Sequence, residues 1–149
     1  MLDSIYTLKT SRVMLRVQDS GNGELLQQPE QVVPILRLVY SKLDADQEHF
    51  TVFCLNKANR VLMVKTLFSG GMDTTFVDIK VLFRFALLNG ATGIIIAHNH
   101  PSGRVEPSME DRRITGKIAD ACRLFDIKLL DHIILTTGEF LSFRERGLL

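Results

Sequence analysis

Apolar and polar residues alternate with different periods along the chain, and each period predicts an element. Apolar residues recur every three or four positions in 29–43 and in 78–88. This spacing predicts two amphipathic helices, because one helical turn takes 3.6 residues. Pro34 is compatible with the first helix if it lies in the first turn. Asn89 and Gly90 are typical of a left-handed cap, so we expect the second helix to end there.

Short runs rich in β-branched and aromatic residues predict strands. Residues 48–55 and 60–67 are separated by turn-forming residues and predict a hairpin. The run 93–97 is continuously apolar, which predicts a strand buried on both faces in the middle of a sheet. We expect further strands in 4–17, 126–135 and 140–143, and turns in 19–23 and 69–73.

A third predicted helix follows a polar loop. Ser108 is a good N-cap and Asp111 follows three residues later, as in a capping box, so we expect a helix from Ser108 to about Leu124. Strands and helices in this order predict a mixed α/β fold in which helices pack on a curved sheet. The length of 149 residues fits one domain over 1–149.

The composition excludes several classes of protein. The 18 basic and 17 acidic residues give a formal net charge of +1, so no global field attracts nucleic acid or an anionic membrane. The N-terminus has no signal-peptide pattern, and no apolar stretch reaches the roughly 20 residues of a membrane span. Cys54 and Cys122 lie in apolar surroundings, so we expect buried free thiols in a reducing cytoplasm.

The segment 98–111 carries the candidate chemistry. His98 and His100 are one residue apart and follow the predicted central strand, so in an extended chain both point to one side. Asp111 can point back to the same place from the next helix. Two imidazoles and a carboxylate make a three-ligand zinc set with a fourth position for water, which is typical of catalytic sites. Ser108 can cap the helix and can also donate to an oxyanion.

Three other interpretations of this segment are weaker. The sequence His-Asn-His at 98–100 also spells the name of the HNH nucleases, but in those enzymes the three residues are spread along a ββα unit. Zinc nucleobase deaminases need a Pro-Cys-x-x-Cys signature, which this chain lacks. An incidental polar loop would not explain His-x-His-Pro followed by a glycine-containing loop and Ser-x-x-Asp.

The segment matches the JAMM motif of the JAB1/MPN metalloprotease family, which is His-x-His-Pro, six residues, Ser, two residues and Asp. The resemblance covers about residue 48 to the C-terminus. It implies a cytidine-deaminase-like α/β fold and zinc-dependent cleavage of an amide or isopeptide bond. The RadC-like bacterial branch of the family resembles this chain most, in segments 83–90, 97–103, 107–108, 131–134 and 142–145.

The resemblance also implies a role for individual residues. His98, His100 and Asp111 would be the zinc ligands, and Ser108 would help to hold the oxyanion. The family has a general acid/base glutamate on an earlier strand. Glu48 is the best match, because it stands at the start of the first long strand.

Other ionisable residues have less specific contexts. We expect Glu106 and Glu110 to be solvated, since they lie in the loop and at the helix cap. Asp131 and His132 recur in the RadC-like pattern, where they can tune the site from behind or, as we favour, form a buried hydrogen-bonded pair. His49 is expected at the surface or at a strand edge.

These observations favour a zinc metallopeptidase or isopeptidase acting on a peptide or isopeptide substrate. A DNA-repair-associated module is an alternative, but the near-neutral charge and the absence of a helix-hairpin-helix motif from the first 45 residues argue against it. A non-catalytic interaction module is a second alternative, against which the complete ligand set argues. The sequence predicts no oligomeric state.

Overall fold

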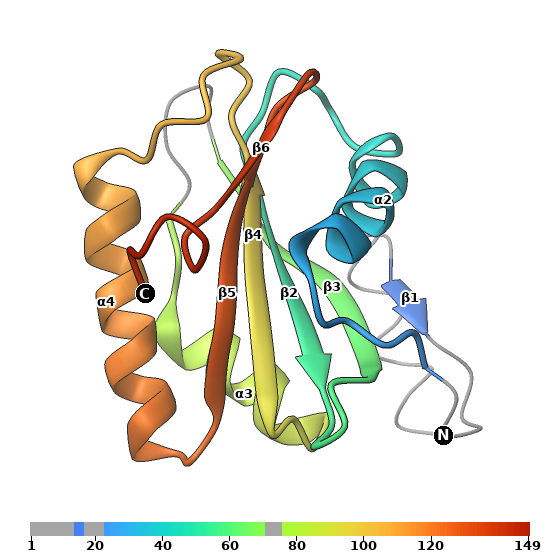
Figure 1. Ribbon diagram of the computed structural model, residues 1–149, viewed down its shortest axis with the longest axis vertical. Helices are drawn as coiled ribbons and strands as arrows, with labels where there is room; N and C mark the ends of the chain where they lie inside the picture. Colours follow the sequence, from blue (N-terminus) through green and yellow to red (C-terminus); the bar gives the residue numbers. More distant parts are fainter. Residues whose placement is uncertain (1–13, 17–22, 71–75) are drawn as a thin grey trace.

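The computed structural model describes residues 14–16, 23–70 and 76–149, which form one six-stranded sheet covered by helices on both faces (Figure 1). The strand order is β1-β3-β2-β4-β5-β6. The elements are β1 (Met14–Arg16), α2 (Pro29–Tyr40), β2 (His49–Leu55), β3 (Val61–Ser69), α3 (Ile79–Leu88), β4 (Gly93–Asn99), α4 (Met109–Leu124), β5 (Lys128–Leu135) and β6 (Phe140–Ser142).

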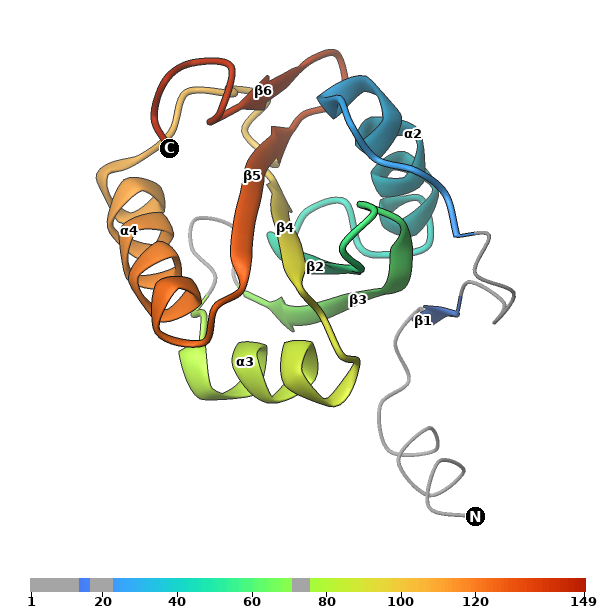
Figure 2. The same ribbon diagram turned by 60° about the horizontal axis from the view of Figure 1, so that its bottom comes forward.

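The sheet is mixed. Strand β2 is antiparallel to both β3 and β4, whereas β4 and β5 are parallel. Parallel neighbours need a crossover connection, and α4 provides it between β4 and β5. Figure 2 shows how strongly the sheet twists between β5 and β3. The structure therefore confirms the predicted mixed α/β fold and the central position of β4, which is buried from Gly93 to His98.

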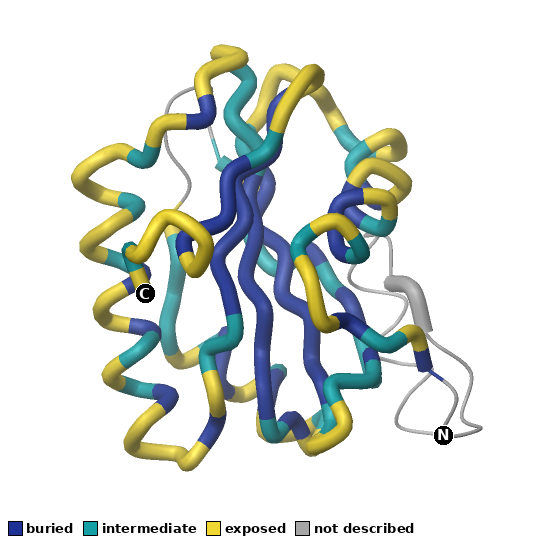
Figure 3. The backbone as a smooth tube through the Cα atoms, in the orientation of Figure 1, coloured by how far each residue is buried: buried dark blue, intermediate teal, exposed yellow. Residues whose placement is uncertain are grey.

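Strand alternation divides the core between the two faces of the sheet. Phe53 and Ile95 point towards α2 and share its apolar cluster. Ile94 and Ile96 point the other way and pack with apolar residues of α3 and α4. Figure 3 shows that the strands are buried while the outer sides of the helices are exposed. Because side chains alternate with period two, His98 lies on the α3/α4 face.

The first helix departs from the prediction in two respects. It ends at Tyr40, and Ser41 is its C-cap, so the predicted end at Leu43 was wrong. Pro34 lies inside the helix and not in its first turn. A proline there removes a donor to the carbonyl four residues earlier. That carbonyl belongs to Glu30, an exposed residue in the first turn of the helix.

Several predicted boundaries hold within about two residues. Gly90 adopts φ +63°, a left-handed conformation that favours glycine, and it terminates α3 as expected. Of the strands predicted in 4–17, the described part is β1, which pairs with β3. The remainder of that segment, and most of the turns predicted at 19–23 and 69–73, lie outside the described residues.

Two expectations concern the whole molecule. Both cysteines are buried free thiols, as predicted, and burial raises the pKa of Cys54 to about 12 and that of Cys122 to about 11. Among the described residues, no helix is both long enough and apolar enough to cross a membrane.

Candidate metal centre

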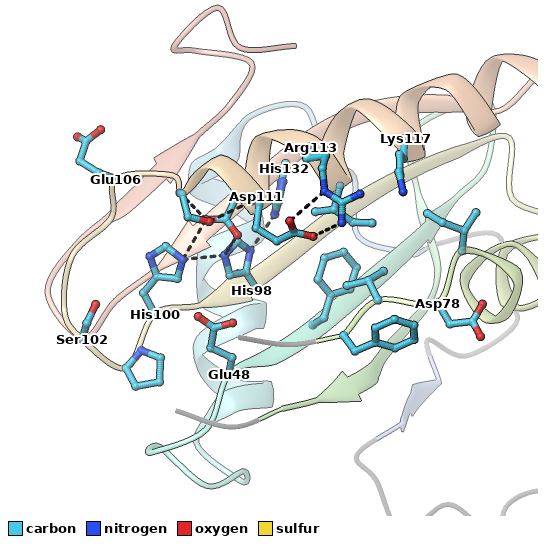
Figure 4. Close-up of a pocket in the computed structure, with 18 of the residues that line it drawn as sticks. Glu48, Asp78, His98, His100, Ser102, Glu106, Asp111, Arg113, Lys117 and His132 are labelled. Atoms are coloured by element: carbon cyan, nitrogen blue, oxygen red, sulfur yellow. Dashed lines mark hydrogen bonds and ion pairs between the residues drawn. The ribbon is translucent and has the colours of Figure 1, made fainter. Parts of the chain in front are cut away.

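Three side chains meet where β4 ends and α4 begins. The Nε2 atoms of His98 and His100 are 2.8 Å apart (Figure 4). The Asp111 carboxylate lies 3.2 Å from Nε2 of His98 through Oδ1 and 3.4 Å from Nε2 of His100 through Oδ2. All three side chains are largely buried, with exposed fractions of 4%, 11% and 14%. The structure thus brings together the three ligands predicted from the sequence.

The start of α4 orients the Asp111 carboxylate. Ser108 is the N-cap, and its Oγ accepts a hydrogen bond of 3.0 Å from the Asp111 backbone N–H. In return, Asp111 Oδ2 accepts a bond of 2.8 Å from the Ser108 N–H. This is the predicted capping box. It fixes the carboxylate so that Oδ1 faces His98 while Oδ2, which accepts the capping bond, also faces His100.

A tight turn after β4 orients the His100 ring. Gly103 adopts φ +81°, which favours glycine, and its N–H donates to the His100 carbonyl at 3.1 Å. The chain thereby brings the Arg104 carbonyl to 2.7 Å from His100 Nδ1. A carbonyl only accepts, so Nδ1 carries the proton. The Nε2 lone pair of His100 therefore points towards the cluster.

A chain of hydrogen bonds orients His98 in the same way. The Thr115 hydroxyl donates to the Asp111 carbonyl at 2.6 Å, so its oxygen accepts from His132 Nδ1 at 2.7 Å. Nε2 of His132 is then left to accept from Nδ1–H of His98 at 2.8 Å. This order of donors leaves Nε2 of His98 unprotonated and facing the cluster.

The donor set consequently fits a divalent metal ion. Two imidazole lone pairs and one carboxylate converge with ligand atoms within 4.8 Å of one another. Three acceptors facing one point repel each other unless a cation lies between them. Tetrahedral zinc with bonds of about 2.0–2.1 Å places its ligand atoms roughly 3.3 Å apart. The observed separations of 2.8–3.4 Å are close to that spacing.

The electrostatics of the cluster show that the ionised Asp111 carboxylate also favours a proton on His100, so a proton competes with a metal ion for this place. Burial opposes ionisation of Asp111, but hydrogen bonds with His100 and His98 hold its pKa well below the ordinary value. Burial lowers the pKa of His100, yet the hydrogen bonds to Asp111 and to the Arg104 carbonyl raise it overall. Complete burial and the nearby His98 keep the pKa of His132 well below its usual range, so His132 is a neutral acceptor.

Glu48 reaches the cluster from the position just before β2. Phe50 stands opposite His98 in the antiparallel pair. Extending this register by two residues towards the start of β2 places Glu48 opposite His100, on the same face. Figure 4 shows the Glu48 carboxylate beside the two histidines. Its negative charge contributes to the raised pKa of His100. Glu48 and the cluster line one cavity of about 590 Å³.

Asn99 fixes the backbone around Glu48, and this role was not predicted from the sequence. Its Oδ1 accepts from the His49 N–H at 2.7 Å, and its Nδ2 donates to the Gln47 carbonyl at 2.8 Å. The Glu48 carbonyl accepts from the Gly70 N–H at 2.9 Å. Both peptides that flank Glu48 are therefore tied to the strand that carries the histidines. The sequence does contain a signal for this role. Asn99 is the middle residue of His-x-His, so in an extended strand its side chain must point away from the side that the two histidines face.

Asp131 and His132 do not form the pair that was expected. Asp131 accepts from the Ser142 hydroxyl at 2.6 Å and from the Arg144 N–H at 3.0 Å. It contacts His132 only through the backbone N–H of that residue. Neighbouring strand residues face opposite sides of the sheet. Of the two, only His132 therefore contacts His98 in the cluster. Asp131 instead holds the turn that follows β6, through Ser142 and Arg144.

The predictions for Glu106 and Glu110 are confirmed, whereas the prediction for His49 is not. Glu106 and Glu110 are exposed, as expected. The prediction for His49 was wrong, because its exposed fraction is only 3%. Its Nδ1 lies 2.7 Å from the Ser69 hydroxyl, and its Nε2 lies 2.7 Å from the Asp44 carbonyl. The segment after α2 and the end of β3 cover this ring.

The fold and the cluster together define a mixed α/β domain with a candidate metal site at the carboxyl end of its central strand. The sequence profile of the RadC-like JAB domain matches residues 26–148. The chain belongs to this family, as its motif indicated.

Curated relatives are UPF0758 proteins from diverse bacteria. The protein of Rubrobacter xylanophilus is 40% identical over 135 residues, which are 91% of this chain and 58% of the relative. That of Vibrio parahaemolyticus is 41% identical over 125 residues, 84% of this chain and 55% of the relative. That of Flavobacterium johnsoniae is 45% identical over 101 residues, which are 68% of this chain and 44% of the relative. The chain thus spans about half the length of these relatives.

Proposed function

We propose that this domain is a zinc-dependent hydrolase that cleaves a peptide or isopeptide bond. His98, His100 and Asp111 would hold the ion. The observation that carries the proposal is the convergence of two lone pairs and a carboxylate, each oriented by a second hydrogen bond. When bound, zinc supplies a Lewis acid for the scissile carbonyl and lowers the pKa of water.

Glu48 is the general acid/base in this proposal. It would take a proton from the attacking water and pass it to the leaving amine. Its place opposite His100, on the cluster's face of the sheet, supports this role. Asn99 would act as a positioning residue, since its amide spans the peptides on both sides of Glu48.

Ser108 would steady the oxyanion. Its hydroxyl oxygen already accepts the capping bond from Asp111 N–H. A hydroxyl that accepts keeps its own proton available to donate, so the cap and the oxyanion role are compatible. Ser108 also lines the same cavity as Glu48 and the cluster, which supports the assignment.

A peptide and isopeptide substrate screen on the zinc-loaded protein tests the proposal. We expect Glu48→Gln to retain zinc and to lose at least about a hundredfold of the turnover found for the wild type. Glu106→Gln is the matched control, because Glu106 lines the same cavity but is exposed in the loop. Equal turnover in wild type and Glu48→Gln would refute the role of Glu48. Absence of turnover on both substrate classes would contradict the proposed reaction.

A further inference from the structure

The cavity at the cluster continues along one face of α4. Asp111, Ile114 and Lys117 follow one another at intervals of three residues and line the cavity. Each interval advances about 4.5 Å along a helix, so Ile114 comes directly after the metal ligand. Val77 and Ile79, at the start of α3, also line the cavity. Figure 4 shows Lys117 and Asp78 on the far side of His98 from His100.

The surface next to the cluster is apolar. Phe50, with an exposed fraction of 2%, lines the cavity, and its ring lies nearly parallel to that of His98 at 6.4 Å. Val77, Ile79 and Ile114 are each partly buried against the same apolar cluster as Phe50. These four side chains form what we call the apolar subsite.

Two acidic residues that line the cavity, Glu110 and Asp78, have hydrogen-bond partners of their own. Glu110 accepts from Arg113 Nε at 2.9 Å. Asp78 caps α3 by accepting from the Lys80 N–H at 2.9 Å. Both carboxylates are therefore engaged within the protein, and the apolar subsite lies in the same cavity wall.

We propose that the apolar subsite binds an aliphatic or aromatic group on the acyl side of the scissile carbonyl. This inference rests on the proposed function. The leaving amine must receive its proton from Glu48. The strand register places the Glu48 backbone beyond Phe50, towards His100, and Figure 4 shows its carboxylate beside both histidines. The acyl group then points the other way, towards Ile114. Because Ile114 follows Asp111 by about 4.5 Å along the helix, we expect a chain of three or more carbons to reach it and a methyl group to fall short.

Hydroxamates of different chain length test the subsite, since their two oxygens bind zinc while the acyl chain remains variable. The probes are acetohydroxamate and 4-methylpentanohydroxamate, titrated calorimetrically into the zinc-loaded protein. In the wild type, the branched chain is expected to bind about tenfold tighter or better, because it removes more apolar surface from water. In Ile114→Ser this ratio should fall below about threefold.

Leu124→Ser is the matched control, because Leu124 lies on the same helix, outside the cavity, with an exposed fraction of 82%. It should keep the wild-type ratio. Val77→Ser gives a second test on the opposite wall if Ile114→Ser does not fold.

The outcomes separate the inference from the proposed function. Equal affinity of the two probes for the wild type would overturn the apolar subsite, and so would a preference that survives both Ile114→Ser and Val77→Ser. Failure of acetohydroxamate itself to bind the zinc-loaded protein would instead contradict the proposed function, and the inference would fall with it.

Discussion

Each ligand atom of the cluster owes its direction to a second bond made by the same side chain. The Arg104 carbonyl fixes the tautomer of His100, and His132 fixes that of His98. The Ser108 N–H fixes the Asp111 carboxylate. Such outer contacts commonly change metal affinity by ten- to a hundredfold. The residues that orient the ligands are therefore as testable as the ligands themselves.

His132→Phe should weaken zinc binding by roughly ten- to a hundredfold. Phenylalanine fills the buried position but cannot accept the hydrogen bond from Nδ1–H of His98. Affinity is measured by competition with a chromophoric chelator. His132→Gln, which retains an acceptor, should recover part of the loss. Unchanged affinity in a folded His132→Phe protein would show that the hydrogen bond does not orient His98.

Asn99→Ala should retain zinc but reduce turnover by about tenfold or more, since misplacement of a catalytic group by about 1 Å can cost a hundredfold. The effect should pass through Glu48, whose neighbouring peptides Asn99 holds. The double variant Glu48→Gln/Asn99→Ala should consequently turn over substrate no more slowly than Glu48→Gln. Additive losses in this double-mutant cycle would show that Asn99 acts independently of Glu48.

At the scale of elements, the N-terminus of α4 links the stability of the fold to the cluster, because Asp111 belongs to both the capping box and the cluster. The spacing Ser-x-x-Asp predicted the α4 cap directly, because both partners lie within one turn of chain. The hydrogen bonds of His98 with His132 and of Asn99 with Gln47 join residues 34 and 52 positions apart. They depend on how β4 pairs with β5 and β2, which local patterns do not specify. The sequence therefore predicted which three side chains come together better than the contacts that orient them.

Ser108→Ala should destabilise the metal-free protein by about 1 kcal/mol, the usual effect of removing an N-cap hydroxyl. It should also weaken zinc binding, because the capping box holds Asp111. Chemical denaturation and chelator competition measure the two effects. Ser102→Ala, an exposed serine in the preceding loop, is the control. A Ser108→Ala protein as stable as the wild type would contradict the cap's contribution.

For the whole molecule, the proposed zinc ion and a proton would compete for the same position in the cluster. Zinc needs a neutral His100, and the pKa of this residue is raised above its ordinary value of 6.5. Zinc affinity should therefore begin to fall above pH 6.5 as the pH is lowered, and by pH 5.5 it should have dropped at least about tenfold from its value at pH 8. Chelator competition across this range measures it. An affinity independent of pH would argue against imidazole ligation.

The zinc content of the purified protein tests the central claim most directly. It is measured by elemental analysis of the wild type beside His100→Ala and Asp111→Ala, with Glu110→Ala as the control from the same helix start. We expect about one equivalent in the wild type and in Glu110→Ala, and little in His100→Ala and Asp111→Ala. A wild type that takes up no zinc, or an Asp111→Ala protein that retains a full equivalent, would contradict the proposed metal site.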